Sequence, residues 1–186
     1  MKLSAAFKKY FLEPFSLLKK PRHMAKCAMI LALSVLSSYI MSFYPSNYIK
    51  ISFSFLFIAI AGMKYGPLIA ASVAAISDII CFIAHPTGPY MPLLTLTTAL
   101  GGLIVGLFLY KDKNSLLRII ISRLIIVVFI STLLDTYIIS LLFDTMFTAF
   151  LISRMIKNII AFPIEIILLF GILKAVKRIE SKSNID

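Results

Sequence analysis

Residues 116–143 read LLRIIISRLIIVVFISTLLDTYIISLLF, and this stretch decides the fold class of the chain. Its charged residues are Arg118, Arg123 and Asp135, and nearly all the others are aliphatic, aromatic or small. The stretch is longer than the roughly 20 apolar residues that cross a hydrocarbon core of ~30 Å. It therefore predicts a transmembrane helix.

The composition of the whole chain agrees with this prediction. Of its 186 residues, 60% are hydrophobic and only 15% are charged, and the mean hydropathy is +0.98. Soluble domains are roughly 25% charged, so this chain carries too few charges to coat a soluble surface. A chain of this length forms one membrane domain with little outside the bilayer.

Five further apolar segments accompany the first, at residues 24–43, 51–63, 67–84, 92–110 and 150–176. Together they predict an all-α integral membrane domain of six helices in a compact bundle, spanning residues 24–176. Residues 1–23 form a basic leader, either a helix lying on the membrane surface or a basic tail. Residues 177–186 form a second tail. The segment at 51–63 is short, so it needs help from its flanks to span.

Lysine and arginine set the orientation, because cytoplasmic loops carry an excess of both. They gather in the leader, in the tail and in the loops after the second and fourth segments, whereas the other loops hold only Lys50 at an edge. This pattern predicts that both termini are cytoplasmic. The net charge of +11 then belongs to flanks that contact membrane lipids, and nucleic acid is not an expected partner.

Several chemical classes lack their motifs. Cys27 and Cys81 lie in apolar runs without a CxxC or Cys/His cluster, so we expect no metal site and no cofactor. The phosphate-binding GxxxxGK[ST] loop is absent, as are HExxH and GxSxG. The chain is therefore not expected to hydrolyse ATP or to be an enzyme. The alternative is a small multi-span enzyme acting on lipid or prenyl substrates, which would need metal-binding carboxylates on the cytoplasmic side.

Ionisable residues inside spans are costly and mark function or internal pairing. They are Asp78, Arg123, Asp135, Arg154, Lys157 and Glu165. Arg123 and Glu165 lie deep in their spans, and we predict a structural ion pair between them. Arg154 and Asn158 share one helix face in the outer half of the last span.

Polar residues converge on the predicted outer end of the bundle. Asp135 lies at a depth similar to that of Asn158, and the proline-rich loop at residues 84–92 lies on the same side. We predict a pocket there for a ligand arriving from outside. Alternatively, Arg154 and Asp135 only bridge their two helices.

Six stretches carry a resemblance to a known family: YIKISFSF (48–55), AIAGMKYGP (59–67), HPTGPYMP (85–92), GLIVGLFLYK (102–111), LDT (134–136) and RMIKN (154–158). As a set they resemble the folate-specific substrate-binding (S) component of energy-coupling factor (ECF) vitamin transporters. The likeness runs from about Ala25 to Lys177. It implies a vitamin-binding subunit of the bacterial plasma membrane that delivers folate, or a different vitamin, through a membrane coupling subunit and two cytoplasmic ATPases.

The resemblance also implies roles for single residues. Small residues of the first helix, Ala25, Ala28 and Ala32, would pack on the coupling subunit, or else within this chain. Folate combines a flat pterin ring with an anionic glutamate tail, and the implied substrate-binding residues are Lys50, Phe53, Pro86, Thr87, Gly88, Tyr90, Asp135, Tyr137, Arg154 and Asn158. Aromatic rings would stack on the pterin, Asp135 would accept its N–H groups, and basic residues would meet the glutamate. The family usually has arginine, asparagine and tryptophan where Lys50, Asp135 and Tyr137 stand.

Overall fold

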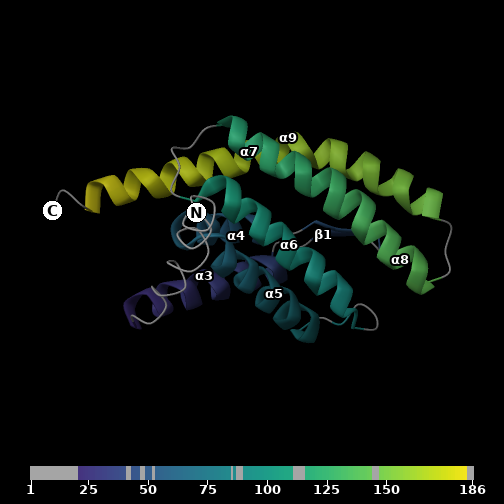
Figure 1. The fold of residues 1–186 in the computed structure, drawn as a ribbon, viewed down its shortest axis with the longest axis horizontal. Helices are drawn as coiled ribbons and strands as arrows, with labels where there is room; N and C mark the ends of the chain where they lie inside the picture. The colour runs from purple at the N-terminus through teal and green to yellow at the C-terminus, as the bar shows by residue number, and fades with distance from the viewer. Residues whose placement is uncertain are drawn as a thin grey trace, which may run out of the picture. The chain divides into compact units, whose positions relative to one another are not determined.

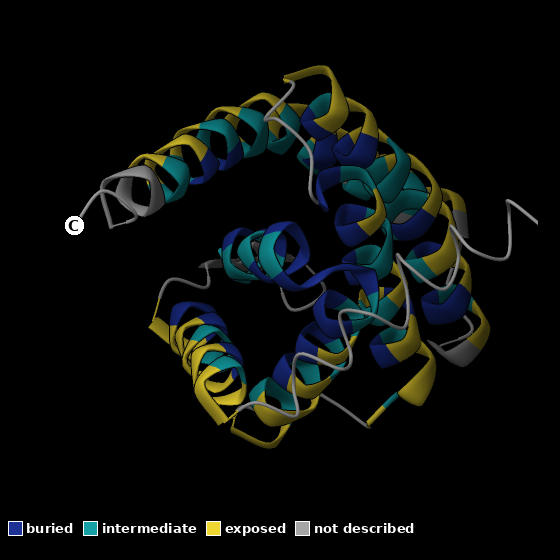
Figure 2. Cartoon of the chain, turned by 60° about the vertical axis from the view of Figure 1, so that its left-hand side comes forward, coloured by how far each residue is buried: buried dark blue, intermediate teal, exposed yellow. Residues whose placement is uncertain are grey.

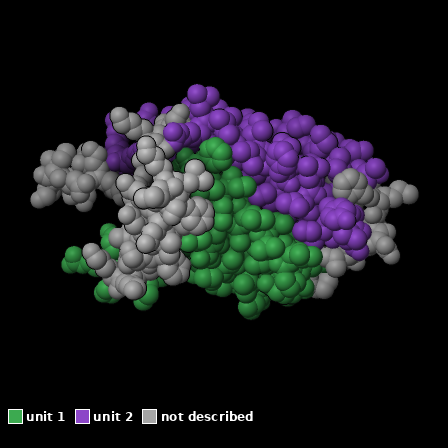
Figure 3. Space-filling model, viewed as in Figure 1, with its two compact units in different colours: residues 1–111 green, residues 112–186 purple. Residues whose placement is uncertain are grey.

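The computed structural model describes residues 21–40, 43–46, 49–51, 53–84, 86, 90–110, 116–143 and 147–183. The predicted leader lies largely outside these residues, as do Thr87 and Gly88. Two compact units make up the chain, Met1–Lys111 and Asp112–Asp186 (Figure 3). Each unit is described by itself.

The first unit is built mainly from helices that pack against one another (Figure 1). They are α3 (Pro21–Ile40), α4 (Ser54–Tyr65), α5 (Pro67–Ala84) and α6 (Pro92–Leu109). Between α3 and α4 the chain forms a short antiparallel hairpin of β1 (Phe43–Ser46) and β2 (Ile49–Ile51), in which Phe43 pairs with Ile51. The sequence did not predict this hairpin. It moves the start of the second helix from residue 51 to Ser54.

Helices α4 and α5 meet at a turn that only glycine fits. Gly66 has a φ of 87° and a ψ of 179°, and its N–H donates to the carbonyl oxygen of Gly62. A residue that carries a Cβ atom is strained at these φ and ψ angles. Pro67 then starts α5 in a position where its missing N–H costs nothing. The Gly-Pro pair thus fixes a sharp reversal between two helices.

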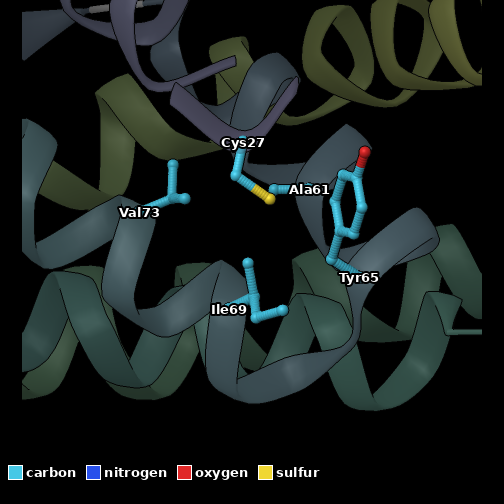
Figure 4. Packing of buried hydrophobic residues seen from close by; sticks show 5 residues of the cluster. All are labelled: Cys27, Ala61, Tyr65, Ile69 and Val73. Atoms are coloured by element: carbon cyan, nitrogen blue, oxygen red, sulfur yellow. The ribbon is translucent and has the colours of Figure 1, made fainter. Parts of the chain in front are cut away.

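A buried apolar cluster joins the first three helices of this unit (Figure 4). Cys27 of α3 packs with Ala61 and Tyr65 of α4, and with Ile69 and Val73 of α5. Cys27 is buried and free, which agrees with a packing role for its small side chain. A buried hydrogen bond of 3.0 Å between the hydroxyls of Ser34 and Ser77 adds a polar link between α3 and α5.

The second unit consists of two long helical segments. The first runs through α7 (Leu116–Ile125), the π-helical segment η2 (Ile126–Leu134) and α8 (Asp135–Phe143) without a break. The second is α9 (Phe147–Ser183), which contains Pro163. Residues 116–143 are helical throughout, as predicted, but the π-helical middle was not predicted. Helix α9 continues past residue 177, where the sequence predicts the tail to begin.

In the part of the chain that the structure describes, five helices are long and apolar enough to cross a membrane: Pro21–Ile40, Pro67–Ala84, Pro92–Leu109, Leu116–Leu141 and Arg154–Arg178. Helix α4 is apolar but shorter, with 12 residues, or about 18 Å at 1.5 Å per residue. Exposed positions run along the helices (Figure 2), and many carry large apolar side chains, such as Ile83 at 73% and Ile167 at 71% exposure. Such surfaces suit lipid, which confirms the prediction of a helical membrane protein.

Candidate functional site

A polar cluster lies in the second unit where η2, α8 and α9 pack together. Its members are Asp135 at the start of α8, and Arg154 and Asn158 one turn apart on α9. The side chains of Arg154 and Asp135 are 13% and 22% exposed, and Asn158 is 7% exposed. The structure therefore brings these three predicted residues together in a mostly buried environment.

Arg154 is held mainly by a backbone group. Its Nη1 donates to the carbonyl oxygen of Ser131 at 3.0 Å, whereas it lies 3.7 Å from Oδ2 of Asp135. A charge-assisted hydrogen bond between such groups measures about 2.7–2.9 Å. The guanidinium is thus fixed in position by Ser131 and only loosely paired with the carboxylate.

The π-helical segment explains how the carbonyl oxygen of Ser131 can accept a hydrogen bond from Arg154. In an α-helix the carbonyl of residue 131 accepts the N–H of residue 135. Here the N–H of Asp135 donates instead to the carbonyl of Ile130, and Arg154 takes the carbonyl of Ser131. π-Helical turns of this kind are frequent at functional sites. Sequence reasoning missed Ser131, because a run of isoleucine and valine gives no signal of a widened turn.

Asn158 is tied to the same segment. Its Nδ2 donates to the hydroxyl of Thr132 at 2.8 Å and lies 3.4 Å from the hydroxyl of Ser131. Thr132 in turn donates to the carbonyl oxygen of Val127 at 2.7 Å. The next threonine, Thr136, is fully buried, and its hydroxyl has no hydrogen-bond partner among the described residues. The cluster is thus organised by hydrogen bonds between α9 and η2.

A second ion pair lies in the same unit. Arg123 on α7 and Glu165 on α9 form a hydrogen-bonded salt bridge, with side chains 9% and 21% exposed. This confirms the pairing predicted from the sequence. Because both partners are engaged with each other, we regard this pair as structural.

Other residues that the sequence predicts for a binding site lie in the first unit. Tyr90 is 44% exposed, its hydroxyl is hydrogen-bonded to that of Thr95, and Thr95 donates to Asp78. Phe53 precedes α4 and stacks on Phe55, with ring centroids 6.5 Å apart. Pro86 is exposed, and Lys50 lies in β2. The sequence singled out Tyr90 and Asp78 but missed Thr95, which resembles any helical threonine.

Four further predicted residues lie on α8 and α3, whereas Thr87 and Gly88 lie outside the described residues. Tyr137 on α8 is 58% exposed, so its ring is accessible. The three small residues of α3, namely Ala25, Ala28 and Ala32, are all exposed. They therefore form an open face of α3.

Comparisons with known proteins agree with one another. The family model for the ECF transporter substrate-specific component matches residues 22–173. The folate transporter FolT of Clostridium novyi is 31% identical over 168 residues, covering 90% of this chain and 97% of that protein. FolT of Leuconostoc mesenteroides is 28% identical over 151 residues, covering 78% and 80%. A crystal structure of FolT bound with folic acid matches with a TM-score of 0.75 and 30% identity, covering 81% of this chain and 92% of that one. The chain therefore belongs to the substrate-specific components of ECF transporters.

Proposed function

We propose that this chain binds folate at the outer face of the membrane and delivers it through an ATP-driven ECF module. The observation that carries the proposal is the likeness, over 81% of this chain, to FolT bound with folic acid. The family consists of transporter components and not of enzymes, which removes the alternative of a lipid or prenyl enzyme. A different vitamin remains the competing ligand.

The polar cluster of the second unit fits the chemistry of folate. Arg154 donates one N–H to the carbonyl oxygen of Ser131, and a guanidinium has five N–H groups. Its long distance from Asp135 leaves room for a stronger bond to a ligand carboxylate, such as those of the glutamate tail. Asp135 then has two possible tasks: accepting N–H groups of the pterin, or balancing the charge of Arg154 before folate arrives.

The proposed folate-binding set is the one that the sequence predicts. In residues 112–186 it comprises Asp135, Tyr137, Arg154 and Asn158. In residues 1–111 it comprises Lys50, Phe53, Pro86, Thr87, Gly88 and Tyr90. Aromatic members offer stacking surfaces, and Lys50 and Arg154 offer positive charge.

Arg154→Ala is expected to weaken folate binding about 10- to 150-fold, because a charge-assisted hydrogen bond contributes roughly 1.5–3 kcal/mol. Calorimetric titration of the purified protein with folate measures this, and thiamine and riboflavin serve as comparison ligands. Lys174→Ala is the matched control, since Lys174 lies over the Phe170 ring on the same helix and should not change the affinity.

Asp135→Asn separates the two tasks of Asp135. If Asp135 contacts the pterin, the loss of affinity should be milder than for Arg154→Ala, because an amide oxygen still accepts. If it mainly balances Arg154, thermal stability should fall instead. Unchanged affinity in both variants, with folded protein, would refute this binding site.

The topology that we propose has six spans and cytoplasmic termini. Five long helices cross the membrane, and α4 crosses with the help of its flanks. In a Cys27→Ala, Cys81→Ala background, Ser46→Cys should react with a membrane-impermeant thiol reagent in intact cells. Ser4→Cys and Ser183→Cys should react only after the cells are opened. Labelling of one terminus alone in intact cells would contradict an even number of spans, and labelling of both would contradict cytoplasmic termini.

The exposed face of α3 is the proposed contact with the membrane coupling subunit, which two cytoplasmic ATPases energise. Small residues let helices approach closely in lipid, so Ala28→Leu or Ala32→Leu should reduce ATP-driven folate uptake and leave folate binding intact. The same change at exposed Ala175 of α9 is the control and should affect neither. Loss of binding as severe as the loss of uptake would place this face in the internal packing of the protein.

A further inference from the structure

Three side chains of the first unit form a hydrogen-bonded chain between α5, α6 and the residue pair that precedes α6. The hydroxyl of Thr95 on α6 donates to Oδ2 of Asp78 on α5 at 2.8 Å. The hydroxyl of Tyr90 lies 3.1 Å from that of Thr95. Helices α5 and α6 pack directly against each other (Figure 1), and Thr95 is 7% exposed. This series of hydrogen bonds thus runs from the carboxylate of Asp78 in an apolar helix to the ring of Tyr90 at the surface of the unit.

The direction of this chain follows from the number of protons available. A carboxylate only accepts, and a threonine hydroxyl has one proton, which Thr95 gives to Asp78. The oxygen of Thr95 can then only accept from Tyr90, so the phenolic proton of Tyr90 is already used. What remains free on the Tyr90 hydroxyl is a lone pair. Asp78 therefore makes the Tyr90 hydroxyl, at the outward end of this series of hydrogen bonds, a hydrogen-bond acceptor.

The ring of Tyr90 is held at both ends and is still accessible. Its centroid lies 5.1 Å from that of Phe82, with the planes tilted by 57°, and its hydroxyl is bound to Thr95. The residue nevertheless remains 44% exposed. A fixed and accessible ring loses little conformational entropy when it binds a ligand, which favours affinity.

The location of Asp78 adds weight to this arrangement. An ionisable group within a membrane span costs several kcal/mol and usually has a partner or a function. Among the described residues, no basic side chain forms an ion pair with Asp78, whose Oδ2 accepts a hydrogen bond from the hydroxyl of Thr95. Thr95 alone would fix the position of Tyr90 as well if Asp78 were apolar, but it would not fix the direction of the hydrogen bond.

We propose that Asp78 is a positioning residue for folate: through Thr95 it orients the hydroxyl of Tyr90 as an acceptor for an N–H donor of the ligand. Asp78 and Thr95 themselves need not touch folate. The inference rests on the proposed folate binding and on the part that Tyr90 has in it. Folate offers such donors on its pterin and in its amide linkage.

A double-mutant cycle on the full-length protein in detergent or nanodiscs tests the proposal, with folate affinity measured by calorimetry. Tyr90→Phe and Thr95→Val are each expected to weaken binding by roughly five- to tenfold, the value of one net hydrogen bond. The double variant should bind no more weakly than Tyr90→Phe alone, because Thr95 acts only through the missing hydroxyl. Thr95→Ser keeps the hydroxyl and should restore the affinity.

Variants of Asp78 complete the test. Asp78→Leu should weaken binding as Thr95→Val does, and again not in the Tyr90→Phe background. Asp78→Asn still accepts from Thr95 and should cost less than about threefold. Thermal unfolding confirms that each variant is folded, and the Thr95 cycle decides the question if Asp78→Leu does not fold.

The outcomes separate the two levels of the proposal. If Thr95→Val causes the same loss of affinity in the unaltered protein and in the Tyr90→Phe background, Thr95 has a structural role. That result would overturn the inference while folate binding stands. Failure of the unaltered protein to bind folate would overturn the proposed function and the inference together.

Discussion

Replacing Glu165 with alanine is expected to lower the free energy of unfolding by about 3–5 kcal/mol, because the change leaves the guanidinium of Arg123 without its carboxylate in a buried position. Both residues lie in apolar helices, α7 and α9, and their side chains are 9% and 21% exposed. Arg123→Ala should lower the free energy of unfolding by about as much, since it leaves the carboxylate of Glu165 partly buried without Arg123. Thermal or denaturant unfolding in lipid–detergent micelles measures both changes.

The double variant Arg123→Met, Glu165→Leu is the decisive control. Removing both charges also removes both desolvation costs, and apolar replacement of a buried ion pair is often neutral or stabilising. We therefore expect the double variant to be at least as stable as the unaltered protein. If it is less stable than either single variant, the cost comes from lost packing and not from an unpaired charge.

Folate binding should survive in that double variant. Glu165 lies about 16 Å beyond Arg154 along α9 at 1.5 Å per residue, and the two arginines have different partners. A loss of folate affinity in a stable double variant would instead assign Arg123 or Glu165 to the ligand.

The ion pair was predictable because it follows from few rules. A membrane span forces ionisable side chains inward and toward one another, and helical periodicity places Arg154, Asn158 and Glu165 on one face. The same rules predicted the proximity of Asp135 to Arg154, which the structure shows at 3.7 Å. Hydropathy alone found the apolar segments, and each of them contains a helix.

What the sequence did not predict depends on hydrogen bonds between segments. The π-helical turn at residues 126–134 frees the carbonyl of Ser131 for Arg154, and no local pattern of isoleucine and valine encodes that exchange. The hairpin of β1 and β2 is too short for a period of two to stand out. Thr95 is buried between Asp78 and Tyr90, and only the packing of α5 on α6 reveals this.

The second large effect is expected from glycines at the packing of α4, α5 and α6. A Cβ on Gly106 would lie 2.4 Å from Cα of Pro67, and one on Gly102 would lie 2.6 Å from the carbonyl oxygen of Ala70. A Cβ on Gly62 would lie 2.9 Å from Cα of Gly106. These neighbours are backbone atoms, which cannot rotate away as a flexible side chain can. The three glycines therefore permit the close approach of helices that small residues provide in membranes.

Gly106→Ala and Gly171→Ala should consequently change the stability of the protein in opposite directions. In a helix interior, alanine is favoured over glycine by about 0.8–1.0 kcal/mol, and this gain applies to both positions. At Gly171 of α9 an added Cβ meets nothing within 4 Å, so Gly171→Ala should raise the thermal stability slightly. At Gly106 the collision with Pro67 should outweigh the gain, with a net loss near the usual 1–3 kcal/mol of overpacking.

The loss of stability in Gly106→Leu should exceed that range, because a side chain of four carbons cannot fit where a single methyl group already collides with backbone atoms. The helices α5 and α6 would have to separate, and the hydrogen bond from Thr95 to Asp78 spans them. Melting temperatures of the two alanine variants and of Gly106→Leu, measured in the same detergent, test the argument. If Gly106→Leu yields a protein as stable as Gly171→Ala, then α5 and α6 do not pack as closely as the structure shows, and the Asp78–Thr95–Tyr90 chain loses its support as well.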